Sequence, residues 1–310
     1  MSPHLRALYY FTKPFLPEYL RVRIRQIHAR EVRRKHSGAW PIDERAGVQP
    51  ADWPGWPDGK KFAFVLTHDV ESAEGLGKVR QLAELEMEYG FRSSFNFVPE
   101  GSYRVPRELR EWLIENGFEI GVHDLNHDGF LYGCEKRFRG KAARINHYLR
   151  EWGAVGFRSA FMLRQLDWLH ELDIDYDAST FDTDPYEPQP DGCGSIFPFW
   201  VPHPADAHQG GYVELPYTLP QDSTLFTVLG ERTAGVWVSK LSWLAGQGGL
   251  ALVNIHPDYI DFETPRSPLR SYPARMLLEL FSDLRERYDG SYWHPLPGEL
   301  SRWFRAKCGV

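Results

Sequence analysis

Short continuous apolar runs alternate along the chain with longer segments in which apolar residues recur at helical spacing. The apolar runs predict β-strands over residues 62–68, 93–98, 118–122, 155–158, 174–179, 212–215 and 250–256. The helical spacing predicts helices over residues 74–89, 106–116, 135–152, 165–172, 233–247 and 272–288. Because strands that alternate with helices pair in parallel, this order predicts an α/β fold whose sheet is open or closed into a barrel.

The N-terminal part of the chain does not follow this alternation. Residues 21–35 carry seven Lys or Arg and one Glu among branched apolar residues, which predicts a basic, partly amphipathic helix. Residues 37–58 are rich in Trp, Pro and Gly, a composition typical of a connecting arm with rigid turns. We therefore expect an N-terminal basic helical arm with a Trp/Pro-rich connector over residues 1–60, followed by an α/β domain over residues 61–310.

The basic helix has two interpretations. Its cations could bind an anionic membrane surface, or the helix could be solvated and pack its few apolar residues on the main body. The whole chain, in contrast, has a net charge of −6 and a pI near 6.1, so it has no general attraction for nucleic acid. No feature of the sequence indicates an oligomeric state.

The composition, with 42% hydrophobic and 25% charged residues, is that of an ordinary globular protein. Three widely spaced cysteines, Cys134, Cys193 and Cys308, indicate neither a disulfide framework nor a CxxC metal site. The apolar stretch at 5–16 is interrupted by Lys13 and lacks a small-residue cleavage site, and no stretch reaches the ~18 to 20 apolar residues that span a bilayer. We expect a cytoplasmic protein, with its basic helix as a candidate for peripheral contact with the inner membrane face.

Reactive side chains gather where the predicted strands end. In parallel β/α folds the C-terminal ends of the strands meet at one rim, where active sites form. The polar residues at these ends are Asp69 and Glu71 after the first strand, His123 and His127 after the third, Arg158 closing the fourth, Asp177 in the fifth and His256 ending the last. A set confined to one rim indicates an active site more strongly than any single residue does.

Two histidines of this set could hold a metal ion. His123 and His127 are four residues apart, and that spacing brings two imidazoles onto one face of a helical turn. An isolated HxxxH pair is more often structural, but this one directly follows the apolar run at 118–122. Two imidazoles and a carboxylate, with one position open for water, form a common catalytic zinc site.

The sequence LTHDVE at 66–71 could supply the carboxylate. Strand alternation places Asp69 and Glu71 on one side of the chain, whereas His68 and Val70 point to the other side. One acid could then bind the ion while the other accepts a proton from water. In the alternative interpretation, both acids cap the helix that follows them.

Together these residues resemble the polysaccharide deacetylases with a NodB homology domain, also called carbohydrate esterase family 4, over residues 61–257. The resemblance implies a distorted (β/α) barrel with five ordered motifs. The first motif, TFDDG, is similar to THDVE at 67–71, which implies Asp69 as the catalytic base. Val70 stands where the family has a metal-binding Asp, so the DxE form implies Glu71 as the metal ligand.

The next two motifs follow in order. HxxxH implies that His123 and His127 are the histidine ligands. The segment RSAF at 158–161 is similar to the RxPY motif, with Ala and Phe in place of the usual Pro and Tyr. This motif implies that Arg158 orients Asp69 through a charge-assisted hydrogen bond, and that the backbone N–H near Phe161 helps to bind the oxyanion.

The last two motifs assign the remaining site residues. Asp177, in YDASTFD, is our choice for the acid of the fourth motif, and Asp182 is the competing choice. The fifth motif, LxH, is similar to NIH at 254–256, where the histidine matches, and it implies His256 as the general acid. Asp222, which follows the ELP segment, is a candidate substrate contact.

The resemblance implies a metal-dependent hydrolase that removes an N-acetyl group from a carbohydrate. We expect one divalent ion, with Zn²⁺ first and Co²⁺, Ni²⁺, Mn²⁺ or Fe²⁺ also accepted by such ligands. The segments at 213–222 and 254–259 resemble the WbmS-like subgroup, which implies an intermediate of surface polysaccharide biosynthesis as substrate. The alternatives are hydrolysis of another C–N bond, in a formamide or cyclic imide, and a non-catalytic sugar-binding barrel that has lost its metal, as Val70 suggests.

Overall fold

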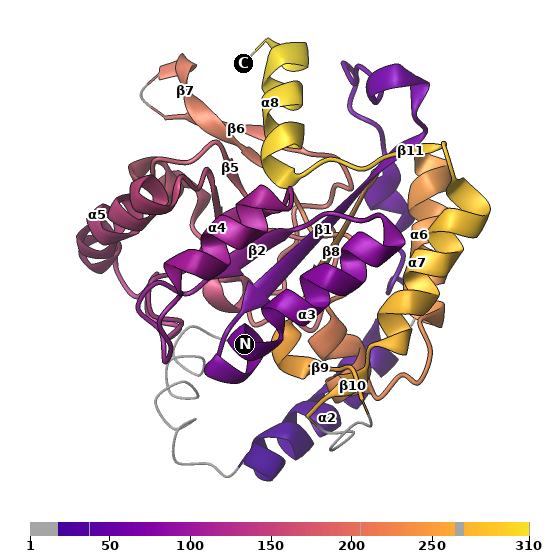
Figure 1. Ribbon diagram of the computed structural model, residues 1–310. Helices are drawn as coiled ribbons and strands as arrows, with labels where there is room; N and C mark the ends of the chain where they lie inside the picture. The colour runs from indigo at the N-terminus through magenta and orange to yellow at the C-terminus, as the bar shows by residue number, and fades with distance from the viewer. Residues whose placement is uncertain (1–17, 37, 205, 264–269, 310) are drawn as a thin grey trace.

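The computed structural model describes residues 18–36, 38–204, 206–263 and 270–309, and it has the expected α/β architecture (Figure 1). In this described part of the chain, nine strands form one sheet in the order β11-β1-β2-β3-β4-β5-β7-β6, with β8 also paired to β1. The strands are β1 (Phe62–Val70), β2 (Ser94–Phe97), β3 (Glu119–His123), β4 (Gly156–Arg158), β5 (Tyr176–Asp177), β6 (Phe199–His203), β7 (Asp206–Glu214), β8 (Leu250–Ile255) and β11 (Tyr292–Trp293). Within the described residues, every pair in this sheet is parallel except β6 with β7.

The sheet curls into an incomplete barrel. β1 pairs with both β2 and β8, which are far apart in sequence. An isolated parallel bridge joins Leu219, in the segment after β7, to Val253 of β8. The sheet therefore almost returns to its first strand, and the predicted distorted (β/α) barrel with an N-terminal arm is confirmed.

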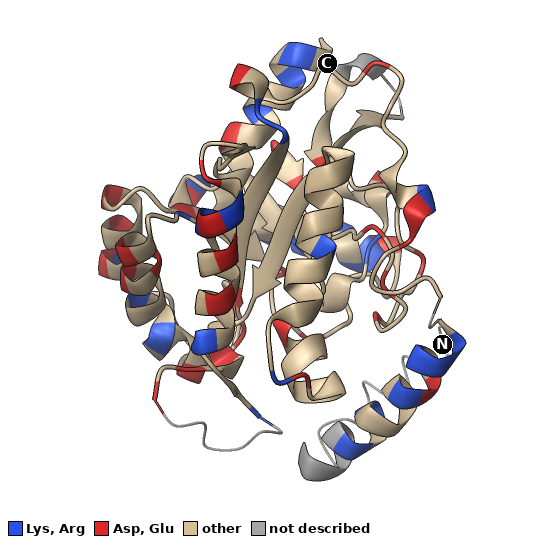
Figure 2. Cartoon of the chain, turned by 90° about the vertical axis from the view of Figure 1, so that its right-hand side faces the viewer, with Lys and Arg blue, Asp and Glu red and all other residues tan. Residues whose placement is uncertain are grey.

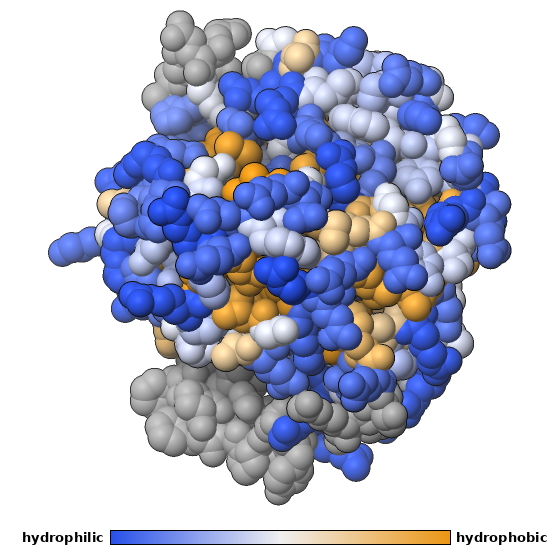
Figure 3. Space-filling view, in the orientation of Figure 1, coloured by the Kyte–Doolittle hydropathy of each residue, from blue (hydrophilic) through white to orange (hydrophobic). Residues whose placement is uncertain are grey.

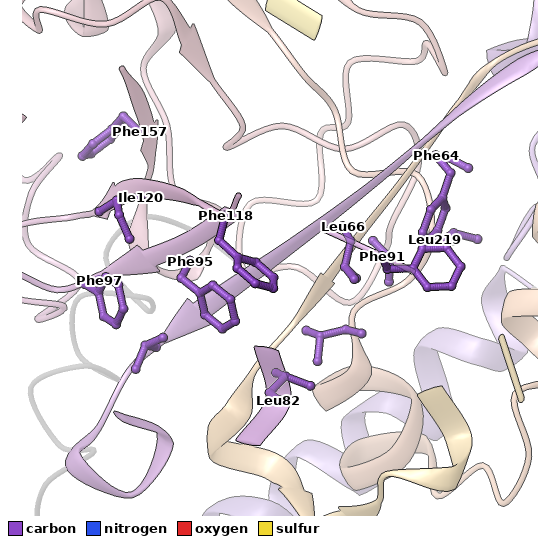
Figure 4. Packing of buried hydrophobic residues seen from close by; sticks show 14 of the residues in the cluster. Phe64, Leu66, Leu82, Phe91, Phe95, Phe97, Phe118, Ile120, Phe157 and Leu219 are labelled. Atoms are coloured by element: carbon purple, nitrogen blue, oxygen red, sulfur yellow. The ribbon is translucent and has the colours of Figure 1, made fainter. Parts of the chain in front are cut away.

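Strand alternation in β1 separates two apolar cores. Phe64 and Val70 belong to the core between the sheet and its helices, part of which is drawn in Figure 4. Val65 belongs to the second core, inside the barrel. Because successive side chains point to opposite faces, the inward row continues with Asp69 at the end of the strand and with Glu71 beyond it. The prediction that Asp69 and Glu71 lie on one side of the chain and His68 and Val70 on the other is confirmed.

Helices cover the outer face of the sheet. They are α3 (Ala73–Tyr89), α4 (Arg107–Glu115), α5 (Glu135–Trp152), α6 (Gly235–Gln247) and α7 (Arg275–Tyr288). The N-cap of α3 is Ser72, whose side chain accepts a hydrogen bond from the backbone N–H of Gly75. The interpretation of Asp69 and Glu71 as caps of this helix is therefore wrong. Figure 3 shows that hydrophilic residues cover most of this face of the molecule, with apolar side chains visible between them.

Several elements differ from the sequence prediction. The helix predicted at 165–172 is a short 3₁₀ helix, η5 (Leu166–Glu171), and the helix predicted from residue 272 begins at Arg275. Its first residues instead form β10 (Tyr272–Pro273), which pairs with β9 (Ile260–Asp261). The β6–β7 hairpin, the π-helix η6 (Ser223–Leu229) and α8 (Pro297–Cys308) were not predicted. Their apolar residues are too few or too irregularly spaced to stand out as a period.

The basic arm forms α2 (Glu18–Lys35), which lies at the lower end of the molecule in Figure 1. It packs on η6 and the residues that follow it. Ala29 and Val32 are buried, and Arg33 forms an ion pair with Glu231 at 3.0 Å. The helix thus packs on the main body through Ala29 and Val32, whereas Ile24 and Ile27 remain exposed, and its contact with a membrane stays a prediction. No helix among the described residues is long and apolar enough to cross a bilayer.

The Trp/Pro-rich connector is anchored by aromatic contacts with α8. Trp53 and Trp56 pack against each other and against Trp303, with ring centroids 4.7 to 5.9 Å apart. This contact explains the apolar face of α8, which covers the connector at the end of the barrel opposite the reactive strand ends. All three cysteines are free, as expected.

Candidate active site

Three potential metal ligands converge at the C-terminal ends of β1 and β3. Glu71 directly follows β1, His123 is the last residue of β3, and His127 lies in the loop after it. One ligand atom of each lies within 4.8 Å of the other two. Nε2 of His127 is 3.0 Å from Oε1 of Glu71. Burial raises the pKa of Glu71, but the nearby histidines, His127 first, outweigh burial and hold this pKa well below its ordinary value. The structure thus brings the predicted ligand set together.

The two histidines do not share a helical turn, and that prediction is wrong. His123 ends a strand, and the loop after it turns back because Asp124 and His127 adopt left-handed backbone conformations, with φ of 56° and 55°. The turn is held by Asp124, whose carboxylate accepts a hydrogen bond from the N–H of Leu125 and whose own N–H donates to the carbonyl of Arg158. Asp is among the residues that tolerate this conformation.

His123 has the properties of a metal ligand. Its Nδ1 lies 3.1 Å from the carbonyl oxygen of Arg158, which can only accept, so the proton is assigned to Nδ1 and the lone pair to Nε2. Nε2 is buried and has no hydrogen-bond partner among the described residues. Burial lowers the pKa of His123, although the nearby Asp69 opposes this shift. The lowered pKa keeps the imidazole neutral. A buried neutral imidazole with an unshared lone pair, beside a carboxylate and a second imidazole, fits a divalent cation.

Asp69 is a buried carboxylate held in position by two amides. Its oxygens accept hydrogen bonds from Nδ2 of Asn96, at 2.9 Å, and Nδ2 of Asn254, at 2.7 Å. Burial would raise its pKa, but His123, Arg158 and these contacts outweigh burial and lower the pKa to about 2. Asp69 is therefore ionised across the physiological range.

Arg158 contacts Asp69 as an ion pair and not through the predicted hydrogen bond. The closest atoms, Nη1 of Arg158 and Oδ1 of Asp69, are 3.5 Å apart. The guanidinium instead donates to the carbonyl of Ala178 and to Oγ1 of Thr67, at 2.8 and 2.9 Å. The hydrogen bonds that orient Asp69 come from Asn96 and Asn254. The sequence analysis missed this role because an uncharged amide in a strand does not stand out as a catalytic residue.

His256 faces the ligand set from the end of β8. Its Nε2 is 3.8 Å from Oε1 of Glu71, and its Nδ1 is 2.6 Å from Oδ1 of Asp222. Burial alone would lower the pKa of His256, but the carboxylate of Asp222 outweighs burial and raises it to about 10. His256 is therefore protonated at neutral pH, as a general acid must be.

Asp222 lies behind His256, and its assignment as a substrate contact is corrected. Its side chain is fully buried, and Oδ2 accepts hydrogen bonds from the N–H of His256, at 2.8 Å, and from the hydroxyl of Tyr272, at 2.9 Å. It also caps the N-terminus of η6 through the N–H of Ser223. A carboxylate so enclosed can orient and charge the imidazole but presents no free oxygen to a substrate.

The two candidates for the fourth-motif acid lie elsewhere. Asp177 accepts hydrogen bonds from the N–H and Oγ of Ser179, and burial raises both its pKa and that of the adjacent Glu214. Asp182 forms a buried ion pair with Lys240 at 2.7 Å. Within the described residues, the carboxylate hydrogen-bonded to His256 is that of Asp222. A catalytic role for Asp177, or for its competitor Asp182, stays a prediction.

Phe161 lies beside the histidines. Its ring centroid is 4.5 Å from that of His127. Its backbone has φ of 57°, within the short 3₁₀ helix η4 (Ala160–Met162). Such a conformation in a bulky residue is uncommon and is characteristic of binding and catalytic sites. The predicted role of the backbone N–H near Phe161 stays a prediction.

No family model and no curated protein sequence matches the chain, whereas solved structures do. A protein from Mycobacterium smegmatis, provisionally described as a polysaccharide deacetylase, has a TM-score of 0.63 at 20% identity, over 84% of this chain and 96% of its own. The peptidoglycan deacetylase PdaC from Bacillus subtilis reaches 0.45 at 13% identity, over 81% and 95% of the two chains. A family 4 acetyl xylan esterase from Clostridium thermocellum, solved with a cobalt ion, reaches 0.45 at 14% identity, over 78% and 91%. The first match establishes a shared fold, and the other two TM-scores are too low to add to it.

Proposed function

We propose that the protein is a metal-dependent hydrolase that removes an N-acetyl group from a carbohydrate. The observation that carries this proposal is the convergence of ligand atoms from Glu71, His123 and His127 within 4.8 Å, beside an ionised Asp69 and a protonated His256. A metal site flanked by one base and one acid suits amide hydrolysis, in which a proton leaves water and another joins the departing amine. The fold shared with the Mycobacterium smegmatis protein supports a carbohydrate as the substrate class.

A divalent ion held by Glu71, His123 and His127 would supply Lewis acidity, which polarises the amide carbonyl and makes a water proton more acidic. Asp69 accepts that proton as the water oxygen forms a bond to the carbonyl carbon. Its low pKa keeps it ionised, and its two amide donors hold it in one orientation. Arg158 balances its negative charge from 3.5 Å.

His256 completes the reaction as the general acid. It donates its Nε2 proton to the amide nitrogen as the C–N bond breaks, so the products are acetate and a free amine. Asp222 keeps the imidazole charged and oriented through Nδ1. The backbone N–H near Phe161 is the candidate donor to the oxyanion.

We further propose that the substrate is an intermediate of surface polysaccharide biosynthesis in the cytoplasm. This proposal rests on the resemblance of residues 213–222 and 254–259 to the WbmS-like subgroup. Zn²⁺ is our first choice of metal because two imidazoles and one carboxylate form a common zinc site, although Co²⁺, Ni²⁺, Mn²⁺ and Fe²⁺ accept the same donors.

The direct test is acetate release from N-acetylated mono- and oligosaccharides. We expect turnover by the purified protein supplied with Zn²⁺ or Co²⁺, loss of turnover with excess dipicolinate, and recovery when metal is restored. An N-formyl sugar and a cyclic imide in the same panel test the alternative C–N substrates. Sugar binding without metal uptake and without turnover would instead support the non-catalytic barrel.

We also propose that α2 binds an anionic membrane surface. Ile24 and Ile27 are 46% and 67% exposed on this helix, and the exposed Arg23 and Arg30 flank them. Exposed apolar residues among cations are typical of helices that lie in the headgroup region. Figure 2 shows the Lys and Arg residues distributed along α2.

Co-sedimentation with vesicles tests this surface. We expect binding to vesicles that contain phosphatidylserine and none to neutral phosphatidylcholine vesicles. Each cation near such a surface contributes about 1 kcal/mol, so the Arg23→Gln/Arg30→Gln variant should bind roughly 30-fold more weakly. The matched control, Arg107→Gln/Arg139→Gln, removes two exposed cations from α4 and α5 and should bind like the wild type. Equal loss in both variants would contradict a specific role for α2.

A further inference from the structure

Glu71 is the first residue after β1 and lies outside the sheet. β1 ends at Val70, so Glu71 lacks the ladder hydrogen bonds that fix strand residues. Val70 itself is buried in the core between sheet and helices, facing away from the histidines. Position 70 therefore cannot direct a side chain toward the metal site. The ligand must come from a longer side chain one residue later, with more rotatable bonds to restrain.

A single short segment supplies the missing restraint. It is the 3₁₀ helix η7 (Pro257–Tyr259), which directly follows His256 and lies against α3. The hydroxyl of Tyr259 donates to Oε2 of Glu71 at 3.0 Å. Oε1, the other oxygen, is 3.0 Å from Nε2 of His127. The two oxygens therefore have different roles, because Oε2 is engaged by a phenol while Oε1 faces the histidine side.

Asp258, in the same segment, holds the backbone of Glu71. Its Oδ2 accepts a hydrogen bond from the N–H of Glu71 at 3.0 Å, and its Oδ1 accepts one from the hydroxyl of Ser72. The close approach of the two elements depends on Gly75 in the first turn of α3, where a Cβ would collide with the Asp258 carboxylate. Backbone and side chain of Glu71 are thus both fixed from η7.

We infer that Tyr259 and Asp258 are positioning residues that fix Glu71 as a one-oxygen metal ligand, through its Oε1. The inference rests on the metal site proposed above and concerns residues that never touch the ion. It also explains how Glu71 can complete the ligand set although Val70, the last residue of β1, has no group that binds a metal. Groups that orient a metal ligand usually change metal affinity by about 10- to 100-fold when they are removed.

Metal affinity tests the inference without reference to turnover. The dissociation constants for Zn²⁺ and Co²⁺ are measured by competition with a chromophoric chelator, and the Co²⁺ site is followed by its visible absorption. We expect Tyr259→Phe to bind both ions about 10- to 100-fold more weakly. Freed from the phenol, Oε2 can join Oε1 on the ion, so the Co²⁺ bands should weaken as the coordination number rises.

Two controls match these variants. Tyr272→Phe removes the same hydroxyl from a different carboxylate, that of Asp222, and should leave metal affinity unchanged. Gly75→Ala should weaken metal binding by displacing Asp258, whereas Gly77→Ala, in the same helix with open space around its Cβ position, should not. Helix propensity favours both changes alike, so a difference between the two variants at equal thermal stability comes from the collision of the new Cβ with Asp258.

The outcomes separate this inference from the proposed function. If the wild type binds metal and Tyr259→Phe binds it equally tightly with the same Co²⁺ spectrum, the positioning role is overturned and the metal site stands. If the wild type binds neither ion, the proposed function fails and the inference fails with it. Selective weakening in Tyr259→Phe and Gly75→Ala supports both.

Discussion

A variant with Glu71→Gln and His123→Gln is expected to hold no divalent ion and to release no measurable acetate. Both substitutions preserve side-chain volume approximately while removing an anionic oxygen and a basic nitrogen from a site with three protein ligands. Loss of a Lewis acid worth several kcal/mol, at 1.36 kcal/mol for each factor of ten, lowers the rate by at least about 10³-fold. Elemental analysis of the purified variant and an acetate assay are the measurements.

The chain offers a closely matched control on the other face of the same strand. His68 and Glu86 form a buried pair with 2.5 Å between Nε2 and Oε1, on the helix side of β1. The variant His68→Gln/Glu86→Gln makes the same two substitutions in a buried position outside the ligand set. It should retain about one ion per chain, as expected for a single three-ligand site. Metal retained by the Glu71/His123 variant, or lost equally from both variants at equal thermal stability, would contradict the proposed site.

The second large effect is expected from Asp222→Asn, as a change in the pH dependence of kcat. His256 acts as an acid only while protonated, and its pKa is raised to about 10, so the acid form is present at neutral pH and is lost as the pH rises toward that value. Without the Asp222 charge, the largest contribution that raises this pKa is lost, so the pKa of His256 falls even though Glu71 and Asp69 still raise it. The alkaline limb of the pH profile should therefore move to lower pH. Above it, kcat should fall by up to roughly 10²- to 10⁴-fold, the usual contribution of a general acid.

Asp177→Asn is the control because it removes a second buried carboxylate that the sequence predicts to be catalytic and that is not bonded to His256. The carboxylate of Asp177 accepts hydrogen bonds from Ser179 and is not the one bonded to His256, so the alkaline limb should not move. A shift of the alkaline limb in Asp177→Asn with none in Asp222→Asn would contradict the assignment of Asp222 as the carboxylate that charges His256. The readout is the full pH profile, because a merely destabilised variant would lose activity without moving the limb.

Much of the site follows from patterns within a few residues. The alternation of strands and helices predicts a parallel sheet, and its reactive residues are then expected at the C-terminal strand ends. The period of two in β1 predicts that Asp69 and Glu71 share one side and that His68 and Val70 face the other, as observed. His123 and His127 converge as predicted, although a left-handed loop replaces the helical turn.

The partners of these residues come from distant parts of the chain. Asp69 is bonded by Asn96 and Asn254, which are 27 and 185 positions away, and His256 by Asp222, which is 34 positions away. The sheet register places Asn96 directly beside Asp69. No local pattern marks an Asn or an Asp as one of these partners, which is why the sequence placed Asp222 as a substrate contact and not behind His256.

The sequence by itself determined the main alternation of strands and helices, the faces of β1 and the identity of the groups that can bind a metal or carry a proton. Those features depend on backbone periodicity and side-chain chemistry, which act over a few residues. Only the tertiary structure decided which carboxylate charges His256, which amides hold Asp69 and how η7 restrains Glu71. These contacts depend on strand register and on the path of long connections, and both are set by the packing of the whole barrel.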